Sequence, residues 1–243
     1  MDLGLDNKVV LVTGASGAIG AAIARAFAAE GARVAAGWHG NEKAAREAID
    51  PGSGMTVRID QRDPDSATAA VAEVERTLGP VDVLVGNAVA WPAQMADTWD
   101  SLVDGFTANT VGPLALVEAA LPGMRRAGWG RIVLISSDVV EQPLPMVGYP
   151  AAKAALETAA HVLAIREARH GILTNVVRPG FTLTERALAT RQAAVDSESA
   201  KTPTGRICTP QDVASAVAYL GSAANGHVNG EVVSVAGGRQ LTR

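Results

Sequence analysis

The chain has 243 residues, 48% of them apolar, and a formal net charge of −4. This length suits one large α/β domain or two small ones with a sizeable core, and the acidic balance argues against a nucleic-acid partner, which normally leaves a basic footprint. No apolar run reaches the ~20 residues that span a bilayer, so we expect no membrane partner. The single cysteine, Cys208, excludes an internal disulfide, and the four histidines show no metal-ligand spacing. The first residues carry no basic region and no signal-like core, which predicts a cytoplasmic protein.

The first elements in chain order are a strand, a glycine-rich turn and a helix. Residues 9–12 form a short apolar run that predicts a buried parallel strand. Small residues fill positions 13–17, and residues 18–30 have apolar side chains at helical spacing. This arrangement aims backbone N–H groups and a helix N-terminus at a phosphate. The alternative is an ordinary tight turn that needs glycine for its backbone angles, but the first such turn of a doubly wound sheet is where a dinucleotide binds.

Short apolar strands alternate with helical stretches along the rest of the chain. The alternation predicts parallel strands with helices on both faces. Because such connections are right-handed, we expect a doubly wound (Rossmann) α/β sheet of about seven strands. No linker, repeat or low-complexity tract interrupts the pattern, so one domain is expected to cover residues 1–243. The expected strands are residues 9–12, 33–37, 55–59, 81–86, 131–136, 173–177 and 231–235.

Two later segments have distinct signals. Thr209 and Pro210 mark the start of a helix, with Thr209 as its N-cap and Asp212 near its positive end. Residues 181–204 are rich in Thr, Ala and charge, and they are either a plain surface helix or a mobile lid over a ligand. Because this segment leaves the carboxyl edge of the sheet, where ligands bind in this architecture, we favour the lid.

Tyr149 and Lys153 lie four residues apart in an Ala-rich helical run, so their side chains share one helix face. An ammonium stabilises a phenolate, and we expect it to lower the Tyr149 pKa from its usual value of about 10. The tyrosine could then exchange a proton with an alcohol or ketone near neutral pH. A lone Tyr-x-x-x-Lys also occurs on solvated helices, so this interpretation depends on the glycine turn upstream. Pro150 disfavours helical geometry in the residue before it, which predicts Tyr149 at the very start of its helix.

Together these motifs resemble the short-chain dehydrogenase/reductase family over the whole chain, and in particular its 3-oxoacyl-carrier-protein reductases and related ketoreductases. Residues 13–20 match the family turn Thr-Gly-x-x-x-Gly-x-Gly, except that Ala18 replaces the middle glycine. Each match is weak alone, and their common order and spacing indicate membership. The other matches are Asp60-Gln61, Asn87-Ala88, Asn109, Ser136-Ser137, Tyr149, Lys153, residues 175–180, Thr184, Gly205-Arg206 and Gly237-Gly238.

The resemblance implies hydride transfer between C4 of a nicotinamide and a carbonyl carbon, with the protein supplying orientation and the proton. It makes Tyr149 the proton donor, and Lys153 the group that lowers the Tyr149 pKa and hydrogen-bonds the nicotinamide ribose. A serine would hold the carbonyl oxygen. Counting along the preceding strand, as in related ketoreductases, selects Ser137, although spacing back from Tyr149 allows Ser136 as well. Asn109 is implied to hold a water that passes protons to Lys153, or else it is a helix-kink or capping residue.

The end of the second strand bears on the choice of cofactor. An acidic residue there would bind the ribose 2′-hydroxyl of NAD, and a basic one the 2′-phosphate of NADP. Residues 36–41 contain no acid, so we favour NADP(H) over NAD(H), with His39 and Asn41 as neutral donors to the phosphate. Asp60 is implied to accept from the adenine amino group, unless it is a solvated loop carboxylate. The expected cofactor contacts are Gly14, Ser16, Gly17, Ala18, Ile19, Gly20, Trp38, His39, Asn41, Asp60, Gln61, Asn87, Ala88, Tyr149, Lys153, Pro179, Gly180, Thr182 and Thr184.

Loop residues beside the catalytic positions are mainly apolar, which favours a small-molecule carbonyl substrate such as a 3-oxoacyl, polyketide or secondary-metabolite ketone. In relatives the Tyr149 and Asn109 helices pack against copies of themselves, which implies a homotetramer. The candidate pocket walls include Trp91, Val139, Leu144, Met146 and Phe181.

Two basic clusters are candidates for docking a substrate-bearing acidic carrier protein. Such clusters are more often solvated helix ends, where cations are favoured. The clusters are Arg125-Arg126 and Arg166, Arg169 and His170.

Two other functions stay open. An NAD-dependent alcohol, sugar or steroid dehydrogenase would differ in cofactor and direction, and an assay with both cofactors separates it from an NADPH-dependent reductase. A regulator that binds nucleotide without turnover is the third interpretation. Family members of that kind tend to lose the tyrosine or the lysine, and this chain keeps both Tyr149 and Lys153.

Overall fold

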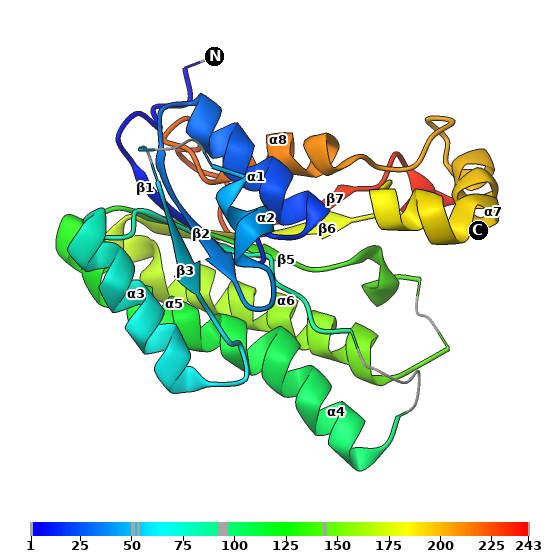
Figure 1. Ribbon diagram of the computed structural model, residues 1–243, viewed down its shortest axis with the longest axis horizontal. Helices are drawn as coiled ribbons and strands as arrows, with labels where there is room; N and C mark the ends of the chain where they lie inside the picture. The colour runs from blue at the N-terminus through cyan, green and yellow to red at the C-terminus, as the bar shows by residue number, and fades with distance from the viewer. Residues whose placement is uncertain (1, 50–51, 53, 92–96, 143–144, 243) are drawn as a thin grey trace.

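The computed structural model describes residues 2–49, 52, 54–91, 97–142 and 145–242. Its centre is a sheet of seven parallel strands in the order β3-β2-β1-β4-β5-β6-β7, with helices on both faces (Figure 1). This is the doubly wound α/β fold that the alternation of elements predicts. The strands are β1 (Val9–Val12), β2 (Arg33–Trp38), β3 (Met55–Arg58), β4 (Val83–Gly86), β5 (Gly130–Ile135), β6 (Ile172–Pro179) and β7 (Val232–Val235).

The helices form the two outer layers. Helices α1 and α8 pack together on one face of the sheet, and α3 packs with α5 on the other, beside α6 (Figure 1). Between them, α4 leads through a π-helical turn (Thr107–Val111) into α5. The helices are α1 (Ala18–Ala29), α2 (Glu42–Arg46), α3 (Pro64–Thr77), α4 (Trp99–Phe106), α5 (Gly112–Ala127), α6 (Gly148–Glu167), α7 (Glu185–Lys201) and α8 (Pro210–Leu220).

The core is split by the sheet, and β1 shows why its strands are apolar throughout. Leu11 belongs to the core under α3, α5 and α6, whereas Val12 belongs to the core under α1 and α8. Successive side chains of a strand point to opposite faces, and here both faces are covered. An uninterrupted apolar run is therefore required, in place of alternation.

The site of function follows from the strand order. Strand β1 pairs with β2 on one side and with β4 on the other. The chain leaves β1 toward α1 on one face and leaves β4 toward α4 and α5 on the other. In sheets with this reversal of strand order, the ligand crevice lies outside the carboxyl ends of the two strands, here β1 and β4, and the loops that follow β1, β4, β5 and β6 leave the sheet at that edge.

The local predictions are confirmed where the structure tests them. All seven expected strands are present, with their ends shifted by a few residues at most, and Cys208 is buried. The Thr209 N–H donates to Asp212 at 2.8 Å and the Asp212 N–H donates to the Thr209 hydroxyl at 3.2 Å, which completes a capping box. The segment expected as a lid contains α7, whose backbone is non-helical at Arg191. Among the described residues, none of the helices has the length and apolar character needed to cross a membrane.

Candidate active site

The turn after β1 depends on two glycines. Gly14 has φ +66°, and a Cβ atom on Gly20 would lie 2.2 Å from the Gly14 carbonyl oxygen. Gly17 is the N-cap of α1, and no side chain of the described residues caps this helix. The first-turn N–H groups are therefore left for a ligand, as an anion site requires. The residues that follow Gly14 toward the helix are exposed or half-buried at Ser16, Gly17, Ala18 and Ile19.

Thr13 and Asn87 join this turn to the end of β4. The Thr13 hydroxyl oxygen accepts from the backbone N–H groups of Asn87 and Ala88, each at 2.9 Å. The Asn87 side-chain amide donates to the carbonyl oxygens of Thr13 at 2.8 Å and Gly14 at 3.3 Å. The Asn-Ala element therefore holds the glycine turn in shape, which places Asn87 and Ala88 beside any ligand of that turn.

The predicted adenine end lies after β2 and β3. His39 Nδ1 is 3.8 Å from Asp60 Oδ2, and both side chains are partly exposed. Trp38 packs against a small cluster of buried alanines behind the glycine turn. Asp60 also accepts from the Arg62 backbone N–H at 3.0 Å, so one of its carboxylate oxygens braces its own loop.

Two other residues predicted at this end have structural partners. Asn41 Oδ1 caps α2 by accepting from the Ala44 N–H at 3.1 Å, which leaves its amide hydrogens to donate elsewhere. Gln61 is buried, and in the orientation that satisfies its amide it donates to the carbonyl oxygens of Ala108 and Ala88. Its side chain is thus directed into the fold, so Gln61 can approach a cofactor only through its backbone.

Tyr149 is the second residue of α6, as Pro150 predicts, and Lys153 lies one turn further along the same helix face. Lys153 is 2% exposed, and its Nζ donates to the Ile135 carbonyl oxygen at the end of β5 at 2.8 Å. The same Nζ is 5.9 Å from the centre of the Tyr149 ring. The structure therefore brings the phenol and the ammonium together at the carboxyl end of β5.

The pKa of Tyr149 is raised in this structure. Burial is the main cause, the Ser137 hydroxyl opposes the shift, and the Asp138 carboxylate adds to it. The Lys153 pKa falls to about 8, because burial disfavours the ammonium more than the charge of Glu157 favours it. The prediction that Lys153 lowers the Tyr149 pKa is therefore wrong for this structure. Burial sets the direction of the shift, and the Lys153 Nζ is directed to a backbone carbonyl.

Ser136 and Ser137, which spacing left as alternatives, have different partners. The buried Ser136 hydroxyl donates to Glu157 Oε1 at 2.6 Å. Ser137 is half-buried, and its hydroxyl lowers the pKa of Tyr149 against the effect of burial. Neighbouring side chains at the end of a strand point in opposite directions. The structure thus puts Ser137 on the side of the phenol and Ser136 behind it.

Asn109 lies in the π-helical turn between α4 and α5. Its Oδ1 accepts from the Ala90 N–H at 3.0 Å, and its Nδ2 donates to the carbonyl oxygens of Ala90 at 2.9 Å and Gly105 at 3.0 Å. Three of the four hydrogen bonds open to this amide are therefore used, two of them to hold the loop after β4 at Ala90 and one to the carbonyl of Gly105 in α4. This bracing is the role that the side-chain geometry supports directly.

Residues predicted beside the nicotinamide lie where β6 ends. Pro179 is the last residue of β6, and the Thr182 hydroxyl donates to the Gly180 carbonyl oxygen at 2.8 Å. Thr184 is the N-cap of α7, and its hydroxyl accepts from the Ala187 N–H at 3.1 Å. These residues form the path from the sheet to α7.

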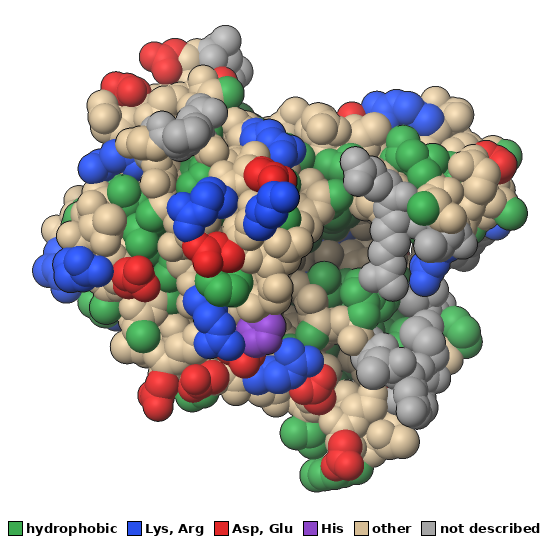
Figure 2. Space-filling view, in the orientation of Figure 1, with side chains coloured by type: hydrophobic (Ala, Val, Ile, Leu, Met, Phe, Trp, Pro, Cys, Tyr) green, Lys and Arg blue, Asp and Glu red, His purple; other side chains and the backbone are tan. Residues whose placement is uncertain are grey.

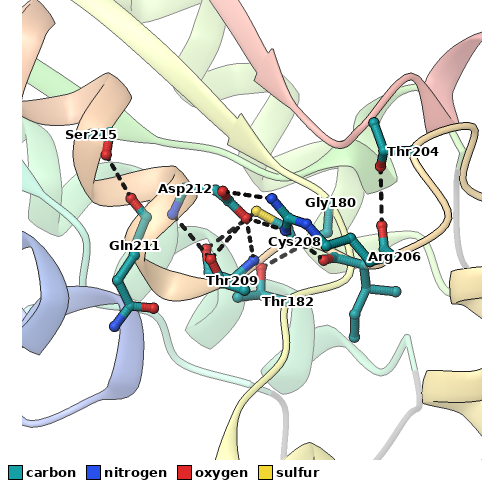
Figure 3. A network of polar contacts seen from close by, with 10 residues as sticks. Gly180, Thr182, Thr204, Arg206, Cys208, Thr209, Gln211, Asp212 and Ser215 are labelled. Carbon is teal, nitrogen blue, oxygen red and sulfur yellow. Dashed lines mark hydrogen bonds and ion pairs between the residues drawn. The ribbon is translucent and has the colours of Figure 1, made fainter.

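The base of the expected lid is tied to α8 (Figure 3). Thr182 and Cys208 form an isolated parallel bridge, and the Cys208 N–H donates to the Phe181 carbonyl oxygen at 3.2 Å. Arg206 binds both carboxylate oxygens of Asp212, at 2.5 and 3.0 Å. The segments before and after the lid are therefore joined to each other, and the second of them is joined to the first turn of α8.

Tyr149 is enclosed by apolar side chains. The Trp91 ring lies against the Tyr149 ring with 4.4 Å between the ring centroids, and Val139 and Met146 pack with Tyr149. This face of the molecule is hollowed between α7 and α4, with hydrophobic side chains along its walls (Figure 2). Leu144, also predicted as a wall, lies outside the described residues.

A second hollow lies toward the C-terminal end of the chain. It has a volume of about 860 Å³ and is lined by Glu141, Gln142, Ser234 and residues 239–242. Ser137, Tyr149 and Lys153 are not among its lining residues. We therefore do not assign it to the reacting carbonyl.

Sequence reasoning missed three charged residues around this site. Glu157 and Arg178 form a buried pair directly behind Ser136, with Arg178 Nη2 donating to Glu157 Oε2 at 2.6 Å. Asp138 lies beside Ser137 and has a pKa raised mainly by burial. Glu157 could have been found, because it continues the four-residue spacing of Tyr149 and Lys153. Arg178 could not, because only the pairing of β5 with β6 brings it there.

Comparisons with known proteins agree with this geometry. Residues 14–240 match the family described as enoyl-(acyl carrier protein) reductase. The chain is 34% identical to acetoacetyl-CoA reductase of Rhizobium meliloti, covering 96% of this chain and 98% of the relative. It is 34% identical to 3-oxoacyl-[acyl-carrier-protein] reductase FabG of Salmonella typhimurium, covering 98% and 100%. A gluconate 5-dehydrogenase from Burkholderia cenocepacia, solved with NADP and tartrate, superposes with a TM-score of 0.88 at 30% identity, covering 100% of this chain and 98% of the other.

The fold and the convergence of Ser137, Tyr149 and Lys153 at the crevice define an oxidoreductase of the doubly wound class. The uncapped α1 N-terminus and the close-packed glycine turn fit a dinucleotide at that crevice. The chain belongs to the short-chain dehydrogenase/reductase family.

Proposed function

We propose that this protein is an NADPH-dependent ketoreductase in which Tyr149 protonates the oxygen of a reduced carbonyl. The observation that carries the proposal is the convergence of Tyr149, Lys153 and Ser137 at the end of β5. Bound NADPH would supply the hydride to the carbonyl carbon. The names of the relatives, acetoacetyl-CoA reductase and 3-oxoacyl-carrier-protein reductase, support reduction as the reaction.

The chain's own residues would bind the carbonyl oxygen and supply its proton. Ser137 would hold the oxygen while negative charge develops on it. The raised pKa keeps Tyr149 as a phenol at neutral pH, which is the form that donates a proton. The ammonium of Lys153 would then stabilise the phenolate that remains and bind the nicotinamide ribose. Asn109 would brace the loop after β4 and, as the family resemblance implies, hold a water near Lys153.

The preference for NADPH rests on the end of β2. No acidic residue occupies positions 36–41, so a 2′-phosphate would meet no repulsion from this stretch. His39 and the amide hydrogens of Asn41, which its helix-cap contact leaves available, would donate to it. Asp60, whose Oδ2 lies 3.8 Å from His39 Nδ1, would accept from the adenine amino group. The NADP bound to the gluconate 5-dehydrogenase supports the same choice.

The substrate that best fits the walls is an apolar carbonyl compound such as a 3-oxoacyl thioester. Trp91, Val139 and Met146 surround Tyr149 with apolar surface. Docking of a carrier protein gains little support from the basic clusters, because Arg125 and Arg166 are paired with Glu167 and Glu118 within the chain. A coenzyme A thioester or free ketone therefore makes a suitable first substrate for tests, with a carrier-bound thioester as a further one.

We further propose that the protein assembles as a homotetramer through α5 and α6 and acts in the cytoplasm. Three apolar side chains of the π-turn and α6 are exposed, namely Val111 (57%), Val162 (56%) and Ile165 (83%). Apolar surface of this kind on neighbouring helices is typical of a subunit contact. Light scattering of the purified protein tests the assembly.

The test of function is a turnover assay with NADPH or NADH and acetoacetyl-CoA or simple apolar ketones, with Tyr149→Phe as the control. We expect oxidation of NADPH that exceeds that of NADH and is lost in Tyr149→Phe. The reverse assay, with alcohols or sugar acids and NAD⁺, tests the dehydrogenase alternative, which the gluconate 5-dehydrogenase neighbour favours. Tight NADPH binding without turnover of any carbonyl would support the regulator.

A further inference from the structure

Three residues of α6 face three consecutive residues at the end of β5. Tyr149, Lys153 and Glu157 are spaced by four, so they share one helix face. Each of them contacts a different residue among positions 135–137, so the helix face and the strand end are joined at three points. The pairs are Tyr149 with Ser137, Lys153 with the carbonyl of Ile135, and Glu157 with Ser136.

Glu157 is the buried charge in this series. It is 5% exposed, and its Oε1 accepts from Ser136 at 2.6 Å and from Arg178 Nε at 2.7 Å, while its Oε2 accepts from Arg178 Nη2 at 2.6 Å. Arg178 comes from β6 and pairs on its other side with Glu141. A two-pronged guanidinium contact holds the carboxylate as an anion in one orientation.

Lys153 has few charges around it. Glu157 is on its own helix, Arg178 of β6 lies behind Glu157, and Asp138 acts on Tyr149 from the β5 side. Burial brings the Lys153 pKa down to about 8, and the charge of Glu157 opposes that fall. Without the anion, the ammonium would lose its proton closer to neutral pH.

We propose that Glu157 is a positioning residue of the active site: it keeps Lys153 protonated at working pH, and through Ser136 it holds the strand end so that Ser137 faces Tyr149. This inference rests on the proposed function. Glu157→Gln removes the charge and keeps the shape of the side chain. It should lower the affinity of the Lys153 amine for its proton. Glu157→Asp keeps the charge on a shorter side chain and should retain most of that proton affinity.

The direct experiment is a ¹³C NMR titration of the lysine side chains in the ligand-free protein. The chain has four lysines, Lys8, Lys43, Lys153 and Lys201, so the Lys153 signal can be assigned by its loss in Lys153→Arg. We expect the Lys153 midpoint to fall by about one pH unit in Glu157→Gln, a tenfold change in the ratio of protonated to neutral lysine at a given pH. We expect it to stay near that of wild type in Glu157→Asp. An unchanged midpoint in Glu157→Gln overturns the proposal.

A matched control separates this role from stability. Glu167 lies on the same helix, is buried and is paired with Arg125 and Arg166, but it is far from Lys153. Glu167→Gln should lower the melting temperature and leave the Lys153 midpoint alone. If Glu157→Gln does not fold, Arg178→Gln gives the second measurement. Loss of the cation that offsets Glu157 should raise the Lys153 midpoint, and a fall or no change counts against the proposal.

Turnover adds an independent readout. The rate of ketone reduction should decline at a lower pH in Glu157→Gln than in wild type, since the reaction needs Lys153 protonated. A shifted NMR midpoint without turnover of any carbonyl would leave the proposal standing and remove the proposed function. Turnover with an unshifted midpoint and pH profile would overturn the proposal about Glu157 and leave the proposed function standing.

Discussion

The indole of Trp91 lies on the ring of Tyr149, with the two ring planes tilted by 30° and their centroids 4.4 Å apart. Trp91 itself is 54% exposed, whereas Tyr149 is 6% exposed. The tryptophan therefore covers the phenol on one side while more than half of its own surface stays exposed. This contact contributes to the burial that raises the Tyr149 pKa.

Replacement of Trp91 by alanine should weaken the binding of apolar ketones and bring the Tyr149 pKa back toward its ordinary value. Loss of one aromatic contact costs about 1 kcal/mol, so KM should rise by roughly fivefold. Steady-state kinetics with ketones of increasing apolar size measures the first effect, and the pH dependence of kcat measures the second. Trp99→Ala is the matched control, because Trp99 is 80% exposed at the start of α4. Equal effects from both variants would contradict the assignment.

The two adjacent serines should behave differently. Ser137→Ala removes the group that holds the carbonyl oxygen, and kcat should fall by about 10²-fold with little change in stability. Ser136→Ala leaves buried Glu157 without one of its donors and should cost about 1–3 kcal/mol of unfolding free energy. Paired kinetics and urea denaturation of both variants decide the matter. A larger loss of kcat in Ser136→Ala than in Ser137→Ala would reverse the assignment.

His39 should control the choice of cofactor. His39→Ala should weaken NADPH binding more than NADH binding, because only NADPH has a 2′-phosphate at that position. His39→Arg should strengthen NADPH binding by about tenfold, since a guanidinium binds phosphate through two parallel hydrogen bonds. Dissociation constants for both cofactors, measured by fluorescence, check this. The exposed His227 supplies the control variant His227→Ala, and parallel losses for NADPH and NADH in His39→Ala would rule out the specific contact.

Glu167 should make the protein sensitive to acid. Its contacts with Arg125 and Arg166 lower its pKa from 4.5 to about 2. The folded state therefore holds this proton more weakly than the unfolded state, and the stabilisation is complete above pH 4.5 and lost as the pH falls toward 2. The difference in unfolding free energy between wild type and Glu167→Gln should accordingly be large at pH 7 and shrink below pH 4. A difference that does not depend on pH would show that the ion pairs contribute nothing.

Much of the site follows from local sequence. The strand–glycine–helix order near Gly14, the helix start at Thr209 and the early position of Tyr149 in α6 are all confirmed. Each depends on the backbone preferences of a few adjacent residues, which a sequence displays directly. Membership of the family follows from the same short motifs and is confirmed over residues 14–240.

The environment of each side chain could not be predicted from local sequence in the same way. The direction of the Tyr149 pKa shift was predicted wrongly, because the prediction counted a neighbouring charge and had no measure of burial. Counting along the strand selects Ser137 over Ser136, but only the structure shows that Ser136 contacts Glu157 and so differs from its neighbour.

The sequence by itself determined the order of strands and helices and the ends of several helices, because these depend on short-range periodicity and backbone geometry. The expected site residues came from short motifs and from the family resemblance that those motifs carry. Only the tertiary structure decided that Trp91 covers Tyr149, that Lys153 donates to Ile135 and that Arg178 of β6 reaches Glu157 of α6. Such contacts join residues far apart in the chain. Desolvation and charge pairing depend on distance in space, and they become readable only once the sheet has brought the segments together.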